Sequence, residues 1–304
     1  MKAKTSVLAV FACFLWSTAF AGVKIGLEFF NPLALAGIRF IISGLILLPF
    51  CGGLVNIKKI FSENKKVILL ISFFQIVMVY TLFYRGMTMV TGSSAAVIIG
   101  ASPLISAVMA HFTIKDDPLT LKKFLFILTG LAGVVIITFG TKGAYGFSGR
   151  YLGVALLLLS SISGAAGNIV VAKSKKRINP FVMNAVQIFI GGCTLLAVSF
   201  LFEGVPLFKG LPAKFWISLF WLSTVSAAGF SIWFNLLQRQ GVKVSELNLW
   251  KFVIPVFGAV LSWIILPDEN PNLITIIGMF AVSASIIAYS ICNKKKGYAF
   301  YPRT

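Results

Sequence analysis

Residues 93–120 read SSAAVIIGASPLISAVMAHFTIKDDPLT, and residues 245–272 read SELNLWKFVIPVFGAVLSWIILPDENPN. The two stretches align without a gap at an offset of 152 residues, which places Pro103 over Pro255 and one acidic turn over another. Each stretch is apolar for about 20 residues, the length at which a helix crosses ~30 Å of hydrocarbon. The sequence therefore predicts a membrane protein that contains one structural unit twice.

The composition requires lipid as the solvent for much of the surface. Of the 304 residues, 58% are hydrophobic and 12% are charged, and the mean hydropathy is +0.95. A soluble domain has about a quarter of its residues charged, so this chain cannot cover itself with polar groups. Apolar runs of membrane-spanning length occur ten times, at approximately 6–26, 32–52, 66–86, 90–112, 121–140, 151–172, 180–202, 213–236, 244–266 and 273–292.

Each half of the chain contributes five of these spans. The Asn-Pro pair at 31–32 falls on a second Asn-Pro pair at 179–180, at an offset of 148. We divide the chain into a first five-helix repeat at 1–140, a second at 141–293 and a cytoplasmic basic tail at 294–304. Because five is odd, the second repeat must enter the membrane from the opposite side. The expected fold is an all-α polytopic membrane protein with ten transmembrane helices in two inverted five-helix repeats.

Inverted repeats are typical of secondary transporters. When the two halves exchange conformations, a single central site opens first to one side of the membrane and then to the other. This pattern predicts alternating access. A purely structural duplication is the alternative.

The basic residues predict the orientation. The formal net charge is +19. If the N-terminus is cytoplasmic, 19 of the 27 Lys and Arg residues fall on the cytoplasmic side, six on the opposite side and two within spans. This asymmetry is the positive-inside bias. It predicts that both termini are cytoplasmic, in the inner (plasma) membrane, and it accounts for the charge without nucleic acid as a partner.

Several motifs resemble those of a known family. They are FLWSTAF in the first span, NPLALAGIRF at the start of the second, and the repeated proline and acidic-turn pattern quoted above. The chain resembles the ten-helix EamA-type branch of the drug/metabolite transporter superfamily over nearly its whole length. The resemblance implies a cavity lined by spans one to four and six to nine, with spans five and ten peripheral. Asp116-Asp117 and Phe126 depart from the family's usual Gly-Glu turn and glycine, whereas Gly278 keeps that glycine in the second half.

Polar and aromatic side chains inside spans are candidates for the site. Polar groups there are costly and usually face the bundle interior or a wet cavity. Five large amides either bond a neighbouring helix or contact substrate: Gln75, Asn168, Gln187, Asn235 and Asn248. Five aromatic residues could form interfacial belts: Trp16, Tyr80, Tyr84, Trp233 and Trp250. Trp16 and Tyr80 lie well inside their spans, so we expect these two to stack on a ligand.

Two basic residues lie within spans. Arg39 follows Pro32 by seven residues, ~10 Å along a helix, and relatives of this type favour a structural role for it, bonding backbone carbonyls. Asn248, Lys251 and Pro255 recur at helical spacing on one face. Lys251 either snorkels to the interface or recognises a substrate carboxylate or phosphate.

Pro255 and its counterpart Pro103 are the predicted helix-break residues, because proline leaves a backbone carbonyl without its donor.

The residues that are missing also limit the function. All eight Asp and Glu residues fall in loops or at span ends. A cationic drug would therefore meet Arg39 and Lys251 without a counter-charge. The four cysteines lie in or at the ends of apolar runs and His111 is the single histidine, so no metal site and no cofactor are expected. Without a visible nucleophile–base pair within the spans, an enzyme is not expected.

The preferred hypothesis is an inner-membrane carrier for small metabolites. Amino acids or related carboxylate-bearing solutes fit a site with basic and amide groups, and facilitated export or exchange fits better than cationic drug efflux or carboxylate-gated proton coupling. The alternative is an exchanger of phosphorylated or nucleotide-linked metabolites. The expected partners are a small-molecule substrate and the lipid bilayer, in a monomer or loose homodimer.

Overall fold

The computed structural model describes residues 3–113, 121–140, 146–174, 178–206, 208–239, 242 and 247–297. Within these ranges every regular element is helical, which confirms the all-α class. Seven helical segments there are long and apolar enough to cross a membrane: Lys4–Leu27, Pro32–Cys51, Leu54–Met89, Gly92–Thr113, Ser148–Val171, Pro180–Phe202 and Ala213–Leu237. Three shorter apolar helices, Phe124–Ile137, Val253–Ile265 and Leu273–Ala288, fall in the remaining predicted spans. The chain is a multi-pass membrane protein.

The helices of the first half are α1 (Ala3–Leu27), α2 (Pro32–Leu47), η1 (Leu48–Cys51), α3 (Leu54–Ile71), η2 (Ser72–Met78), α4 (Val79–Met89), α5 (Gly92–Gly100), α6 (Ser102–Thr113) and α7 (Leu121–Gly140). Those of the second half are α8 (Gly146–Lys173), α9 (Pro180–Phe202), α10 (Ala213–Leu237), η3 (Leu249–Phe252), α12 (Val253–Ile265) and α13 (Leu273–Gly297).

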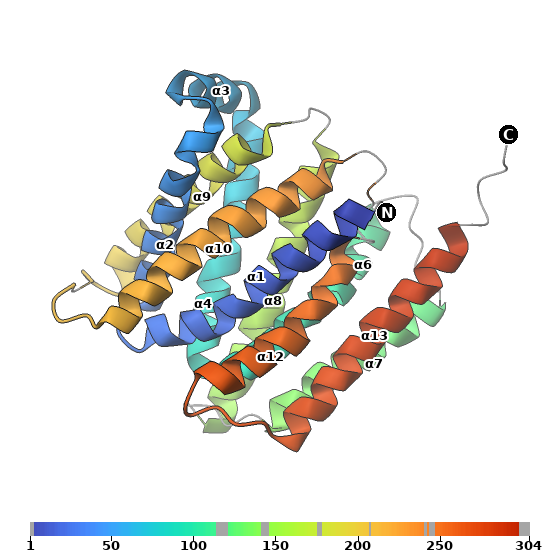
Figure 1. Ribbon diagram of the computed structural model, residues 1–304. Helices are drawn as coiled ribbons and strands as arrows, with labels where there is room; N and C mark the ends of the chain where they lie inside the picture. The colour runs from blue at the N-terminus through green and yellow to red at the C-terminus, as the bar shows by residue number, and fades with distance from the viewer. Residues whose placement is uncertain are drawn as a thin grey trace, which may run out of the picture.

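Helices from opposite halves of the chain pack in pairs. α2 packs along α9, α7 along α13, α1 along α10 and α12, α4 along α8, and α5 along α12. Figure 1 shows the α7–α13 pair at one edge of the bundle, away from α2 and α9. The buried apolar side chains between these pairs form one continuous core.

Glycine allows the closest of these approaches. A Cβ atom added at Gly37 of α2 would lie 2.7 Å from the backbone nitrogen of Leu196 in α9, and one added at Gly192 would lie 2.9 Å from the carbonyl oxygen of Gly37. Gly86 of α4 and Gly153 of α8 make a reciprocal contact, since each faces the other's carbonyl oxygen. Lipid provides no hydrophobic drive between helices, so close backbone packing of small residues holds them together.

The structure interrupts two helices near the predicted break residues. α5 ends at Gly100 and α6 begins at Ser102, so that Pro103 is its second residue. The 3-10 turn η3 gives way to α12 at Val253, and Pro255 is the third residue of that helix. A Cβ atom on Gly100 would lie 2.5 Å from Pro255 Cδ, so the two interruptions pack against each other at the centre of the bundle.

We predict that Gly192→Ala lowers the melting temperature in detergent. The added Cβ meets backbone atoms, 2.8 Å from the nitrogen of Ile41, and backbone cannot rotate away as a side chain can. Overpacking of this kind costs about 1–3 kcal/mol.

Gly164→Ala is the matched control. Its nearest neighbour, Val79 Cγ2, lies 3.6 Å away, and alanine favours a helix over glycine by about 1 kcal/mol. Equal melting temperatures for the two variants would contradict the importance of the α2–α9 contact.

Candidate functional site

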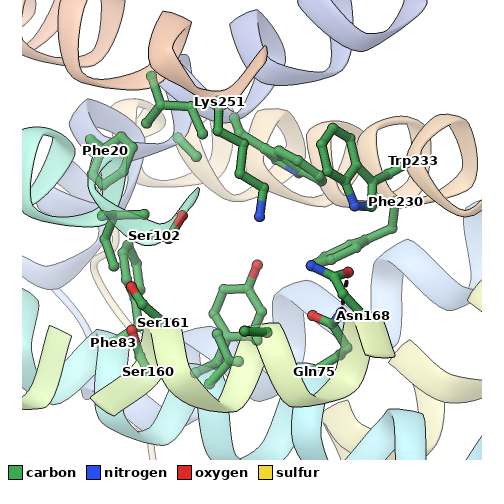
Figure 2. A pocket seen from close by; sticks show the side chains of 18 of the residues that line it. Phe20, Gln75, Phe83, Ser102, Ser160, Ser161, Asn168, Phe230, Trp233 and Lys251 are labelled. Carbon is green, nitrogen blue, oxygen red and sulfur yellow. Dashed lines mark hydrogen bonds between the residues drawn. The ribbon is translucent and has the colours of Figure 1, made fainter. Parts of the chain in front are cut away.

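A cavity of about 130 Å³ lies at the centre of the bundle (Figure 2). Its walls come from α1, α2, η2, α4, α5, α6, α8, α10, η3 and α12. One water molecule requires about 10–15 Å³ of such volume, so the cavity can hold several waters or a small solute. The described lining residues include none from α7 or α13, the fifth and tenth predicted spans, and none from α9.

Six of the nine side chains predicted for the site line this cavity: Trp16, Arg39, Gln75, Tyr80, Asn168 and Lys251. They come from six different helical elements that only the folded bundle brings together. The other three, Gln187, Asn235 and Asn248, lie outside the lining.

Lys251 is directed into the cavity from η3 (Figure 2). Its Nζ lies 5.1 Å from the ring centroid of Trp233 and 6.0 Å from that of Trp16. Among the described residues, no carboxylate lies within 4.0 Å of this ammonium. The aromatic faces attract the cation but leave its charge uncancelled. This geometry favours anion recognition over snorkelling.

Arg39 is fixed by neutral groups. Its side chain is 2% exposed. Nε and Nη2 donate to Ser226 Oγ of α10 at 3.0 and 2.7 Å, and Nη1 donates to Tyr84 OH of α4 at 2.9 Å. The guanidinium carbon also lies 4.7 Å from the ring centroid of Phe40 and 5.3 Å from that of Tyr80. The prediction that Arg39 bonds backbone carbonyls is therefore wrong for these three bonds, since their acceptors are hydroxyl oxygens.

Gln75 and Asn168 form an amide pair at the cavity wall. Gln75 Nε2 donates to Asn168 Oδ1 at 2.8 Å, as the dashed line in Figure 2 marks. Gln75 lies on η2, a π-helical segment that the sequence did not indicate. Such segments are often found at functional sites. The pair presents one more donor, Asn168 Nδ2, and one more acceptor, Gln75 Oε1.

Aromatic rings surround these polar groups. Trp16 contacts Trp233 and Phe230 with centroids 5.1 and 5.5 Å apart. The prediction that Tyr84 and Trp233 belong to an aromatic belt at the membrane interface is wrong, because they are 0% and 1% exposed. The indole nitrogens of Trp16 and Trp233 are both buried, and neither has an acceptor in the described part of the chain.

The remaining predicted amides lie outside the cavity, and two of them make side-chain bonds within their own segment of the chain. Gln187 Nε2 donates to Asn184 Oδ1 at 3.1 Å within α9, and Ser72 of η2 donates to the Gln187 carbonyl. Asn235 accepts from Arg239 Nε at 3.1 Å. Asn248 is 1% exposed and precedes η3.

Two glutamates link the halves of the chain at one end of the bundle. Glu269 accepts from the backbone N–H groups of Gly92 and Ser93, at the start of α5. Glu203 Oε2 accepts from the first turn of α2, and its Oε1 lies 3.0 Å from Arg85 Nη2. A carboxylate at a helix N-terminus satisfies unpaired N–H groups and complements the helix dipole. From the sequence, both appeared to be ordinary acids at span ends.

The cavity is therefore basic. Arg39 and Lys251 are the charged groups among its described lining residues, and Asp and Glu are not among them. Aromatic and aliphatic walls lower the local dielectric constant, which strengthens the attraction of both cations for an anion.

Comparisons with known proteins agree with the arrangement of the chain. A model of the EamA-like transporter family matches residues 3–139 and again residues 151–291. The uncharacterized transporter YvbV of Bacillus subtilis is 29% identical, over 96% of this chain and 93% of its own. The uncharacterized transporter YoaV of the same organism is 24% identical, over 84% and 86%. A solved crystal structure with 15% identity superposes with a TM-score of 0.73, over 97% of this chain and 99% of that one, which supports the fold alone.

We predict that Ser226→Ala destabilises the protein by about 1–3 kcal/mol, because two buried N–H groups of Arg39 lose their acceptor. Ser223→Ala is the control on the same helix. Its hydroxyl donates to the Leu219 carbonyl, four residues earlier in α10, so its loss is expected to cost under about 1 kcal/mol. Thermal unfolding in detergent compares the two, and an equal loss in both would contradict the anchoring of Arg39 by Ser226.

Proposed function

The chain belongs to the EamA-like transporter family, and from this premise we propose that it is a secondary transporter of small carboxylate-bearing solutes, amino acids among them, in the plasma membrane. One observation carries the substrate class. The described lining of the central cavity contains two cations and no acid, so a solute that enters must supply the negative charge.

The donors at one wall suit a carboxylate. Lys251 Nζ lies 5.1 Å from the ring centroid of Trp233, and we propose that the two oxygens of a carboxylate accept from the ammonium and from the indole Nε1. Other polar groups of the lining suit the rest of an amino acid. Gln75 Oε1 and the hydroxyls of Ser102 and Ser160 are acceptors for an ammonium group, and the aromatic rings attract a cation through their faces. The apolar walls accommodate an aliphatic or aromatic side chain.

Equivalent positions in the two halves support the inverted-repeat architecture. At the 152-residue offset Ile99 corresponds to Lys251 and Ser102 to Ile254, and all four line the cavity. At the 148-residue offset Phe20 corresponds to Asn168, and both line it as well.

The helix contacts agree with this correspondence between the two halves. α1 packs on α10 and α12, and the corresponding helix α8 packs on α4 and α6. These pairings support ten crossings in two repeats, with the first at 1–140 and the second at 141–293.

The two glutamate contacts support alternating access. They join the first repeat to the second at one end of the bundle, and the exposed Lys214–Glu28 ion pair, at 2.6 Å, adds a third link between the halves. Opening the cavity at this end requires release of these bonds. On the orientation expected from the basic residues, this is the extracellular end, so the described conformation is closed to the outside. This conformation is compatible with loading from the cytoplasm, and we propose export as the direction of transport.

A phosphorylated solute is the second candidate. The two cations in the cavity lining favour it as well, because a lysine ammonium is a compact cation of the kind that binds phosphate. Counterflow in proteoliposomes loaded with sugar phosphates separates the two.

The direct experiment is uptake into proteoliposomes across a panel of amino acids, other carboxylates, sugar phosphates and neutral sugars. We expect saturable uptake of carboxylate-bearing solutes. Transport of sugar phosphates alone would establish the second candidate. Failure to transport any carboxylate-bearing solute, with the protein shown to be folded, would refute the preferred proposal.

We predict that Lys251→Met folds but transports carboxylates at least tenfold less efficiently. A hydrogen bond to a charged group contributes about 1.5–3 kcal/mol, and each 1.4 kcal/mol is a factor of ten. Lys209→Met, at an exposed position in the connection after α9, is the matched control. Wild-type kinetics in Lys251→Met would contradict a role in binding.

We predict a smaller effect for Trp233→Phe, which keeps an aromatic face beside Lys251 and removes the indole donor. The indole is an uncharged donor, so its bond to a carboxylate is expected to contribute less than that of the Lys251 ammonium, and we expect KM to rise severalfold. The measurement is the concentration dependence of uptake. An unchanged KM would show that the indole N–H does not contact the solute.

A further inference from the structure

A second hollow, larger than the central cavity, lies between α1, α2, α9 and α10. Its volume is about 460 Å³. Most of its surface is aliphatic and aromatic, with Ile46, Leu47 and Phe50 on one wall and Phe181 on another. α10 separates the two spaces, since Ala228 and Ile232 face this crevice whereas Phe230 and Trp233 face the cavity. The crevice is therefore a separate compartment.

One end of the crevice carries a fixed cation. Arg239, in the turn that follows α10, lines it together with Asn235. Its Nε donates to Asn235 Oδ1 and its Nη1 to Thr5 Oγ1, both at 3.1 Å. These partners are neutral. Within the described ranges no carboxylate lies within 4.0 Å of the guanidinium.

The crevice lies where helices end, at the level of a membrane surface. Arg239 follows the end of α10 and Thr5 lies in the first turn of α1. Phe50 of η1 stacks on Phe181 in the first turn of α9, with ring centroids 5.9 Å apart. These two rings are 62% and 40% exposed, so the crevice opens sideways toward the bilayer.

The neighbouring helix α3 has an interfacial character. It contacts η1 and α9 and lies at the end of the bundle (Figure 1). Leu54 and Val55 are 74% and 85% exposed, and Lys58 and Lys59 are exposed as well. An amphipathic segment with exposed apolar and basic groups lies at the headgroup level of a membrane and is attracted to acidic lipids.

We propose that this crevice binds one acidic phospholipid, with an acyl chain against the apolar walls and the phosphate at Arg239. Charge complementarity supports this occupant. A basic pocket between helices at a membrane surface suits a lipid headgroup, and the apolar walls suit an acyl chain better than a small hydrophilic solute. The proposal requires only that the chain spans a bilayer, so it does not depend on the transported substrate.

The test measures melting temperatures of the purified protein in detergent with added phosphatidylglycerol or phosphatidylcholine of identical acyl chains. Native mass spectrometry counts the lipids that stay bound. For the wild-type chain we expect a larger upward shift with phosphatidylglycerol and one retained molecule of it. Equal shifts and equal retention for the two lipids would overturn the proposal.

Two variants separate the headgroup from the acyl chain. Arg239→Gln keeps a side chain that can bond Asn235 and removes the charge, so we expect the preference for phosphatidylglycerol to disappear. Ala228→Phe fills the half-buried wall of the crevice, so we expect retention of both lipids to fall. Lys209→Gln, at an exposed position outside the crevice, is expected to behave as the wild-type chain does.

The other outcomes for the two variants also decide whether the crevice binds an acidic lipid. Retained phosphatidylglycerol preference in Arg239→Gln, or undiminished retention in Ala228→Phe, would overturn the proposal. If Arg239→Gln does not fold, Ala228→Phe alone decides. A shift produced by a transported carboxylate, absent with lipid and lost in Ala228→Phe, would assign the crevice to the solute instead.

Discussion

A buried guanidinium, whose hydrogen-bond partners in the described part of the chain are all neutral, organises the centre of this protein. A cation inside a bilayer is stable only where polar groups of the protein replace water. Arg39 meets this requirement with the hydroxyls of Ser226 and Tyr84 and with the faces of Phe40 and Tyr80. The bonds connect α2 to α4 and α10. Because every one of these partners is neutral, the positive charge is held in place but not cancelled, and the adjoining cavity stays attractive to anions.

The packing around this centre depends on small residues. Gly37 and Gly192 bring α2 and α9 within backbone contact, and Gly100 receives Pro255 where two helices are interrupted. In lipid, contacts of this kind replace the hydrophobic drive of a soluble core. They also fix the rotation of each helix about its axis, and this rotation decides which side chains reach the cavity.

One family model matches both halves of the chain, but the halves differ in chemistry. Lys251 and Ile99 occupy equivalent positions and both line the cavity, so one substitution introduces a cation without altering the frame. Arg39 and Gln187 are equivalent at the 148-residue offset. Arg39 lines the cavity, whereas Gln187 bonds Asn184 within α9. Two halves that match one family model can therefore contribute different side chains to one cavity.

The sequence by itself determined the helical class, the approximate spans, the repeat offset and the family resemblance, because hydrophobic length and residue order are local properties. It also selected Lys251, Gln75 and Asn168, since large polar groups are conspicuous in apolar runs. Only the tertiary structure decided which of them meet. Ser226 lies 187 residues from Arg39. It is the second serine in "LSTVSAAG" and resembles many small packing residues. The sequence likewise did not indicate that Glu269 bonds the start of α5, or that Gln75 lies in a π-helical segment. Helix rotation and pairing arise from contacts between distant segments, and a pattern read along one segment carries no record of them.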